Sequence, residues 1–234
     1  MSKISWTDVT WNPITGCTPI SEGCANCYAQ RWAKRLQQIG LGKYLNGFKP
    51  TFHPEELKKP LKWRKPRIVF VCSMGDIFHQ YIDSDFVHRI FGVIRECPQH
   101  TFQVLTKRAE RSAYYAEGYS YLKNVWFGVT VESDKYLRRI NYLPAYNNKC
   151  KTFISFEPIL GPIGDINLEG INWVIVGGET GPGARPMKIE WARQIRDMCI
   201  DQGVPFFFKS HGGTRKRPGH NVLDGKIWNQ MPIT

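Results

Sequence analysis

The stretch Val125-Trp126-Phe127-Gly128-Val129-Thr130 is apolar at nearly every position and lacks the alternation of a half-exposed strand. Strands of this kind are buried on both faces, as in a parallel sheet covered by helices. Comparable stretches occur at residues 67–72, 101–105, 152–156, 172–176 and 204–208, with a shorter β-prone segment at 9–12. The sequence therefore predicts about seven parallel strands.

Helical patterns lie between most of these strands. In the first, Ala29, Trp32, Ala33 and Leu36 recur at helical spacing and predict a helix that starts near Asn26. Further helices are expected from about residue 84, from 109, over 133–143 and over 188–201. Strands alternating with helices favour an α/β fold, a partial (β/α) barrel of six to seven parallel strands that resembles a TIM barrel. An open doubly wound sheet is the alternative.

The length of the chain indicates how many domains it contains. Its 234 residues fit a single domain over 1–234, with an insertion at 40–66 and a polar C-terminal tail from 209.

Because no apolar run reaches about 18 residues and the N-terminus lacks a signal-peptide core, we expect a cytoplasmic protein without membrane contact. The formal net charge of +12 favours a polyanionic partner such as nucleic acid.

Three of the seven cysteines lie close together after the first strand. Cys17, Cys24 and Cys27 have the spacing C-x6-C-x2-C in a loop rich in Gly and Pro. A zinc site usually takes four ligands in two pairs, and this loop offers no fourth Cys or His. Three thiolates in one loop instead suit three corners of a [4Fe–4S] cluster, which leaves one iron open to an external ligand. We therefore predict that these cysteines bind a cluster.

Polar residues follow the other strands, at the edge where parallel strands of a barrel end and active sites form. We expect them to converge on one rim. They are Asp76, Thr106, Lys107, Arg108, Thr130, Glu132, Ser155, Glu157, Gly177, Gly178, Glu179, Arg185 and Lys209.

Together these features resemble the radical S-adenosylmethionine enzymes, and in particular a phage- and prophage-borne family of radical-SAM-like proteins without a settled substrate. The first gap of the cysteine motif is three residues longer than in the commonest pattern of such enzymes, C-x3-C-x2-C. The motifs that carry the resemblance are Trp11-Asn12-Pro13 with Gly16-Cys17, Leu105-Thr106-Lys107-Arg108, Phe127 to Glu132, Ser155-Phe156-Glu157-Pro158 and Val176-Gly177-Gly178-Glu179.

The resemblance implies a cofactor set and a mechanism. Cys17, Cys24 and Cys27 would hold the cluster, and S-adenosyl-L-methionine would bind its open iron. Reductive cleavage would then give a 5′-deoxyadenosyl radical that abstracts a hydrogen atom from substrate. The residues expected to contact the cofactor are Asp76, Thr130, Glu132, Glu157, Gly177 and Gly178.

The resemblance also implies an electron donor such as flavodoxin or ferredoxin. The net charge favours a nucleic-acid substrate, in modification or repair. Candidate substrate-binding residues are Lys107, Arg108, Glu179, Arg185 and Lys209. Two other functions stay open. One is a non-enzymatic nucleic-acid-binding protein stabilised by zinc or a cluster. The other is a barrel hydrolase that uses Glu132, Glu157 and Glu179 as paired carboxylates.

Overall fold

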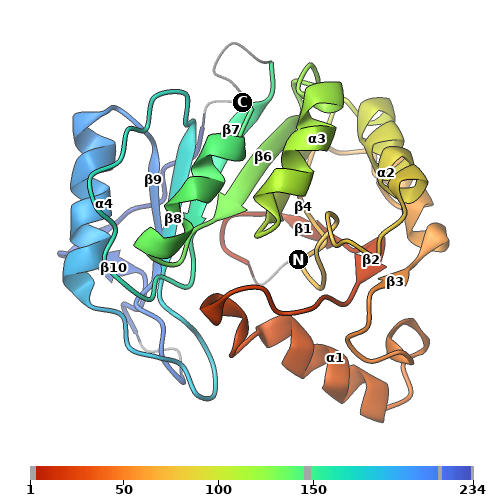
Figure 1. Ribbon diagram of the computed structural model, residues 1–234, viewed down its shortest axis with the longest axis horizontal. Coiled ribbons are helices and arrows are strands. Elements are labelled where there is room, and N and C mark those ends of the chain that lie inside the picture. The colour runs from red at the N-terminus through yellow and green to blue at the C-terminus, as the bar shows by residue number, and fades with distance from the viewer. Residues whose placement is uncertain (1–3, 145–148, 216–217, 233–234) are drawn as a thin grey trace.

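The computed structural model describes residues 4–144, 149–215 and 218–232. One parallel sheet of seven strands dominates the fold, in the order β1-β4-β5-β6-β7-β8-β9. Figure 1 shows this sheet curled into a half-barrel, which confirms the predicted α/β partial barrel. The strands are β1 (Val9–Trp11), β4 (Ile68–Val71), β5 (Thr101–Thr106), β6 (Val125–Thr130), β7 (Lys151–Phe156), β8 (Trp173–Gly177) and β9 (Phe206–Ser210).

Helices cover the outer face of the half-barrel. The α-helices are α1 (Tyr28–Gln38), α2 (Ser84–Glu96), α3 (Ala109–Tyr119) and α4 (Ile189–Asp201). In Figure 1, α2, α3 and α4 lie along the sheet, whereas α1 lies apart from them at the lower edge. The helix predicted over 133–143 is present as a 3₁₀ helix, η5 (Asp134–Tyr142), and the N–H of its first residue donates to Pro162 O at 3.3 Å.

The strands are buried on both faces, as their composition predicts. Val69 and Val71 of β4 pack with α2, whereas Phe70 between them packs on Trp6 inside the half-barrel, with ring centroids 4.7 Å apart. The inner cluster consists of Trp6, Phe70, Trp126, Phe153, Trp173, Ile175 and Phe207. Aromatic side chains thus fill the bottom of the half-barrel and leave its upper rim for polar groups.

The segment predicted as an insertion at 40–66 consists of a short strand and 3₁₀ helices that contact the cysteine loop and the strand before it. It contains η2 (Gly42–Tyr44), β3 (Thr51–Phe52), η3 (Pro54–Lys58) and η4 (Pro60–Lys62). Strand β3 pairs with β2 (Ile14–Thr15), which lies directly before the first cysteine of the loop. A second small hairpin, β10 (Val222–Leu223) with β11 (Lys226–Ile227), closes the C-terminal part.

The apolar face predicted for α1 is only partly buried. Ala29 and Ala33 are buried as expected, but Trp32 is 50% exposed. Among the described residues, no helix is both apolar and long enough to cross a membrane.

Candidate functional site

The polar ends of the strands surround one pocket of about 230 Å³ at the carboxyl rim of the half-barrel. Most residues predicted from the sequence line it, and they come from loops that are far apart in the chain. The predicted residues in the lining are Cys17, Cys24, Cys27, Asp76, Thr106, Lys107, Arg108, Thr130, Ser155, Glu157, Gly178, Glu179 and Lys209. Glu132, Gly177 and Arg185 are outside the lining.

The start of the cysteine loop is fixed by backbone contacts. Gly16 has a φ of 86°, its N–H donates to Met74 O at 2.8 Å, and a Cβ at this position would lie 2.2 Å from Lys49 O. The N–H of Cys17 donates to Phe48 O at 3.0 Å. Because only glycine tolerates both the positive φ and this close approach, residue 16 determines where the first thiol lies.

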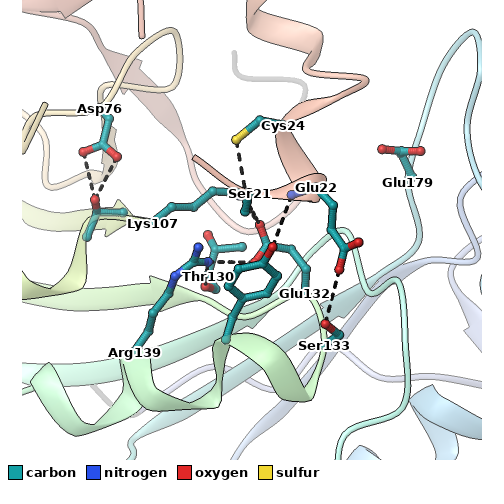
Figure 2. A network of polar contacts seen from close by, with 12 residues as sticks. Ser21, Glu22, Cys24, Asp76, Lys107, Thr130, Glu132, Ser133, Arg139 and Glu179 are labelled. Atoms are coloured by element: carbon teal, nitrogen blue, oxygen red, sulfur yellow. Dashed lines mark hydrogen bonds and ion pairs between the residues drawn. The ribbon is translucent and has the colours of Figure 1, made fainter. Parts of the chain in front are cut away.

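The segment between Cys17 and Cys24 contacts the buried carboxylate of Glu132 through Ser21 and Gly23. Ser21 Oγ donates to Glu132 Oε1 at 2.5 Å, and Gly23 lies so close that a Cβ there would be 2.4 Å from the same oxygen. Arg139 donates to the other oxygen of Glu132 at 2.7 Å, and Lys107 Nζ lies 3.5 Å from Oε1. Figure 2 shows this cluster between Asp76 and Glu179. Glu132 therefore positions the cysteine loop. The sequence alone predicts instead that Glu132 contacts the cofactor.

A second carboxylate holds the other end of the loop. Asn26 Nδ2 donates to Glu179 Oε2 at 2.9 Å, and the Arg185 side chain donates to both oxygens of Glu179. Burial alone would raise the pKa of Glu179, but the hydrogen bonds from Arg185 and Asn26 lower it to about 2. Arg185, predicted as a substrate contact, thus forms an ion pair behind the pocket.

Arg108 connects the first cysteine to Asp76. Its NH1 group lies 3.2 Å from both Cys17 Sγ and Asp76 Oδ2, and its NH2 group donates to Thr18 O at 2.9 Å. Asp76 also accepts from Thr106 Oγ1 at 2.8 Å and from the N–H of Phe78 at 3.0 Å. Burial, followed by the charge of Asp76, raises the pKa of Cys17 to about 11, against the opposing effect of Arg108. In the absence of a metal this thiol is protonated at neutral pH.

Also in the pocket lining, Lys209 from β9 forms an ion pair with Glu157, which follows β7. Gly178 beside them has a structural reason to be glycine, since a Cβ there would lie 2.3 Å from His211 O. The pair places one cation and one carboxylate in the lining of the pocket that also contains the three thiols.

Two buried polar atoms in the pocket lining have no hydrogen-bond partner within the described chain. They are Ser155 Oγ, on β7, and Trp6 Nε1, below it. Ser155 and Trp6 are 1% and 4% exposed, so neither group reaches bulk water. A buried polar atom without a partner is costly and indicates a site where a ligand or water supplies the missing hydrogen bond. The sequence predicts Ser155 as one of the polar residues at the strand ends. It predicts no role for Trp6, because no pattern in the sequence distinguishes this residue from other tryptophans.

The other four cysteines lie outside this loop. Cys97, Cys150 and Cys199 are buried in the core, and Cys72, which lines the pocket from the end of β4, has a φ of 58°. Within residues 4–144, 149–215 and 218–232, no three His, Cys, Asp or Glu side chains lie close enough together to hold one metal ion. A cluster spreads its thiolates over separate irons, so ligands of a cluster need not meet at one point.

Fold and site together define an α/β half-barrel with three free thiols in the wall of a pocket that is lined by both apolar and polar residues. No match was found among curated proteins or among solved structures. The chain belongs to a family described as proteins of unknown function (DUF5131), whose family model matches residues 1–232.

This family assignment corrects the resemblance drawn from the sequence. The match covers nearly the whole chain, and no comparison connects it to a radical S-adenosylmethionine family or to a phage. Assignment to the phage-borne radical-SAM-like family was therefore wrong. The motifs that suggested it are short sequences at strand ends, where many parallel barrels place polar residues for the same geometric reason.

Proposed function

We propose that this protein holds a [4Fe–4S] cluster on Cys17, Cys24 and Cys27 and uses S-adenosyl-L-methionine in the adjoining pocket as a radical enzyme. The observation that carries the proposal is that three free, partly exposed thiols line one pocket, together with polar strand-end residues, at the carboxyl rim of a half-barrel. When bound, such a cluster supplies the electron that cleaves S-adenosylmethionine reductively.

The residues of the chain fit this group in two respects. The loop carries three thiols and lacks a fourth Cys or His among residues 10–29, which suits a cluster with one open iron. The pocket beside the thiols also contains the unpartnered Ser155 Oγ and Trp6 Nε1, which can hydrogen-bond a polar ligand.

Several residues would orient the reactants. Arg108 approaches Cys17 Sγ at 3.2 Å, and a cationic donor at this distance stabilises a thiolate. Asp76 holds Arg108 and Thr106 in place, and most of its acceptor positions are already taken. Thr130, Glu157 and Lys209 remain on the pocket wall as candidate contacts to the cofactor or the substrate.

The proposal also includes an electron donor, a nucleic-acid substrate and a cytoplasmic location. An electron donor such as flavodoxin or ferredoxin would supply the electron, and its acidic surface would complement the net charge of +12. A nucleic-acid substrate is favoured by the same charge. Because all seven cysteines are free thiols, a reducing, cytoplasmic location suits the protein.

Paired-carboxylate hydrolysis is poorly supported by the geometry. Glu132 lies outside the pocket lining, and Glu179 is committed to Arg185 and Asn26. Glu157 and Glu179 line the pocket, but Glu157 forms an ion pair with Lys209. No two of these carboxylates are left to act as acid and base on one substrate.

The test is anaerobic purification followed by measurement of iron, sulfide and the visible spectrum. We expect about four irons and four sulfides per chain after reconstitution, with loss of most of the iron in Cys24→Ala. Cys97→Ala, a buried core thiol, serves as the matched control and should keep its iron. Reduction in the presence of S-adenosylmethionine should release 5′-deoxyadenosine. A reconstituted protein with no iron, or with zinc alone, would overturn the proposal, and a cluster without 5′-deoxyadenosine would indicate a binding protein.

A further inference from the structure

A groove on α1 opens directly beside the thiol pocket. Its lining residues are Tyr28, Arg31, Trp32, Arg35, Thr180, Gly181 and Pro182. Tyr28 and Thr180 line both the groove and the pocket, so the two hollows are contiguous at these residues. Helix α1 follows the cysteine loop without a break, and thus the groove is built from the same segment as the proposed cluster site.

The groove combines exposed aromatic rings with positive charge. Trp32 is 50% exposed and Tyr28 is 43% exposed, although large aromatic side chains are usually buried. The guanidinium of Arg35 lies 5.5 Å from the centre of the Trp32 ring. Helix α1 carries Arg31, Lys34 and Arg35 and contains no acidic residue. The surface therefore offers stacking planes and cations in one place.

The far wall of the groove is held in position. Arg31 donates to Pro182 O at 2.9 Å and to Thr180 O at 3.1 Å. Gly181 has a φ of 96°, and a Cβ at this residue would lie 2.3 Å from Arg31 NH2. Arg31 is thus occupied in shaping the groove, while Arg35 and Lys34 are exposed and available to a ligand.

From these features we infer that the α1 groove binds single-stranded nucleic acid and presents one of its bases to the pocket. Bases stack on exposed aromatic rings, and Arg and Lys side chains track the phosphates. A base in a duplex is stacked and cannot enter a recessed pocket, so the strand must be single or locally opened. The inference rests on the proposed function only in treating the pocket as the site of reaction.

The pocket has features that suit the incoming base. Trp6 and Phe70 add aromatic rings to its lining, and Trp6 Nε1 is a hydrogen-bond donor without a partner among the described residues. A nucleobase offers both a flat face and polar edge atoms, which would satisfy these two demands together.

The experiment measures binding of a fluorescein-labelled single-stranded oligonucleotide of mixed sequence to the full chain by anisotropy. The same oligonucleotide as a duplex is the second probe. We expect single-strand binding to exceed duplex binding and to weaken as salt is raised. Trp32→Ala should lower affinity for the single strand about 5- to 100-fold, the range measured for loss of one stacking side chain. Arg35→Gln should reduce the slope of log K against log salt by about one.

Matched controls come from exposed positions elsewhere on the molecule. Tyr114→Ala removes an aromatic ring of α3 that is 66% exposed, and Arg89→Gln removes an exposed guanidinium stacked over Phe86 on α2. Both should bind the oligonucleotide like the natural chain. Thermal unfolding of every variant checks that each is folded.

Equal binding by Trp32→Ala and Tyr114→Ala would overturn the groove as the binding site. Equal binding of duplex and single strand would overturn the assigned class of nucleic acid. A groove that bound only an acidic protein, such as a reduced flavodoxin used as a further probe, would assign it to the electron donor and refute the inference. The binding readout does not require iron, so failure of the cluster proposal and failure of this inference are distinguishable.

Discussion

Gly23 lies directly against the carboxylate of Glu132, and a Cβ on residue 23 would be 2.4 Å from Oε1 and 2.7 Å from Cγ. The contact joins the cysteine loop to the buried end of β6. Ser21, two residues earlier, donates to the same oxygen at 2.5 Å, so two positions between Cys17 and Cys24 contact Glu132.

The contact predicts that Gly23→Ala displaces the loop. A methyl group at this position must push aside a carboxylate that is fully buried and paired, and overpacking of this kind costs about 1–3 kcal/mol. We expect a loss of this size in urea unfolding, together with faster labelling of Cys24 by a thiol reagent. Gly42→Ala is the control, since nothing lies within 4 Å of a Cβ there. Equal effects of both substitutions would show that the loop does not rest on Glu132.

Glu132 itself should be essential for stability. Glu132→Gln removes the charge that faces Arg139, 2.7 Å away, and leaves a guanidinium buried without its counter-ion. Breaking a buried ion pair in this way costs about 3–5 kcal/mol. Glu22→Gln, in the same loop but exposed, should change the free energy of unfolding by less than about 1 kcal/mol. A Glu132→Gln protein as stable as the natural chain would contradict the assigned role.

The low pKa of Glu179 predicts a pH dependence of stability. Its pKa of about 2 in the folded chain is below the ordinary value of 4.5, because the hydrogen bonds from Arg185 and Asn26 outweigh burial. The ionised form is therefore favoured by folding, so its stabilisation is present above about pH 4.5 and is lost as the pH falls towards 2. We expect the free energy of unfolding to fall less steeply over this interval in Glu179→Gln than in the natural chain.

The control for that measurement is Glu190→Gln, on the exposed side of α4 with a side chain that is 70% exposed. Its pH profile should follow that of the natural chain. Parallel profiles for all three proteins would mean that Arg185 and Asn26 do not hold Glu179 in solution.

Two hydroxyls on β7 allow a matched test of the pocket. Ser155 Oγ has no partner, whereas Thr152 Oγ1 donates to Gly170 O at 2.6 Å. Thr152→Val should destabilise the fold by about 1 kcal/mol, and Ser155→Ala should leave stability nearly unchanged. If the pocket binds S-adenosylmethionine as proposed, Ser155→Ala should weaken that binding about 3- to 10-fold in calorimetry. An unchanged affinity would show that this hydroxyl does not contact the ligand.

The sequence by itself determined the sheet. Each strand is a local run of apolar residues long enough to be buried on both faces, and parallel strands must end at one edge. For that reason the strand-end residues Asp76, Thr130 and Glu157 were expected to converge, and they do line one pocket. The three cysteines were also grouped by sequence alone, because they share one short loop.

Only the tertiary structure decided how each polar side chain is used. Glu132 and Glu157 both closely follow a strand, yet Glu132 lies under the cysteine loop and Glu157 lines the pocket. Their difference depends on where distant residues lie: Ser21 and Arg139 surround one carboxylate, and Lys209 pairs with the other. Likewise, helical spacing placed Trp32 with Ala29 and Ala33 on one buried face, but the sheet buries only the two alanines. Local pattern sets which residues share a face or an edge, whereas long-range packing sets what each side chain meets there.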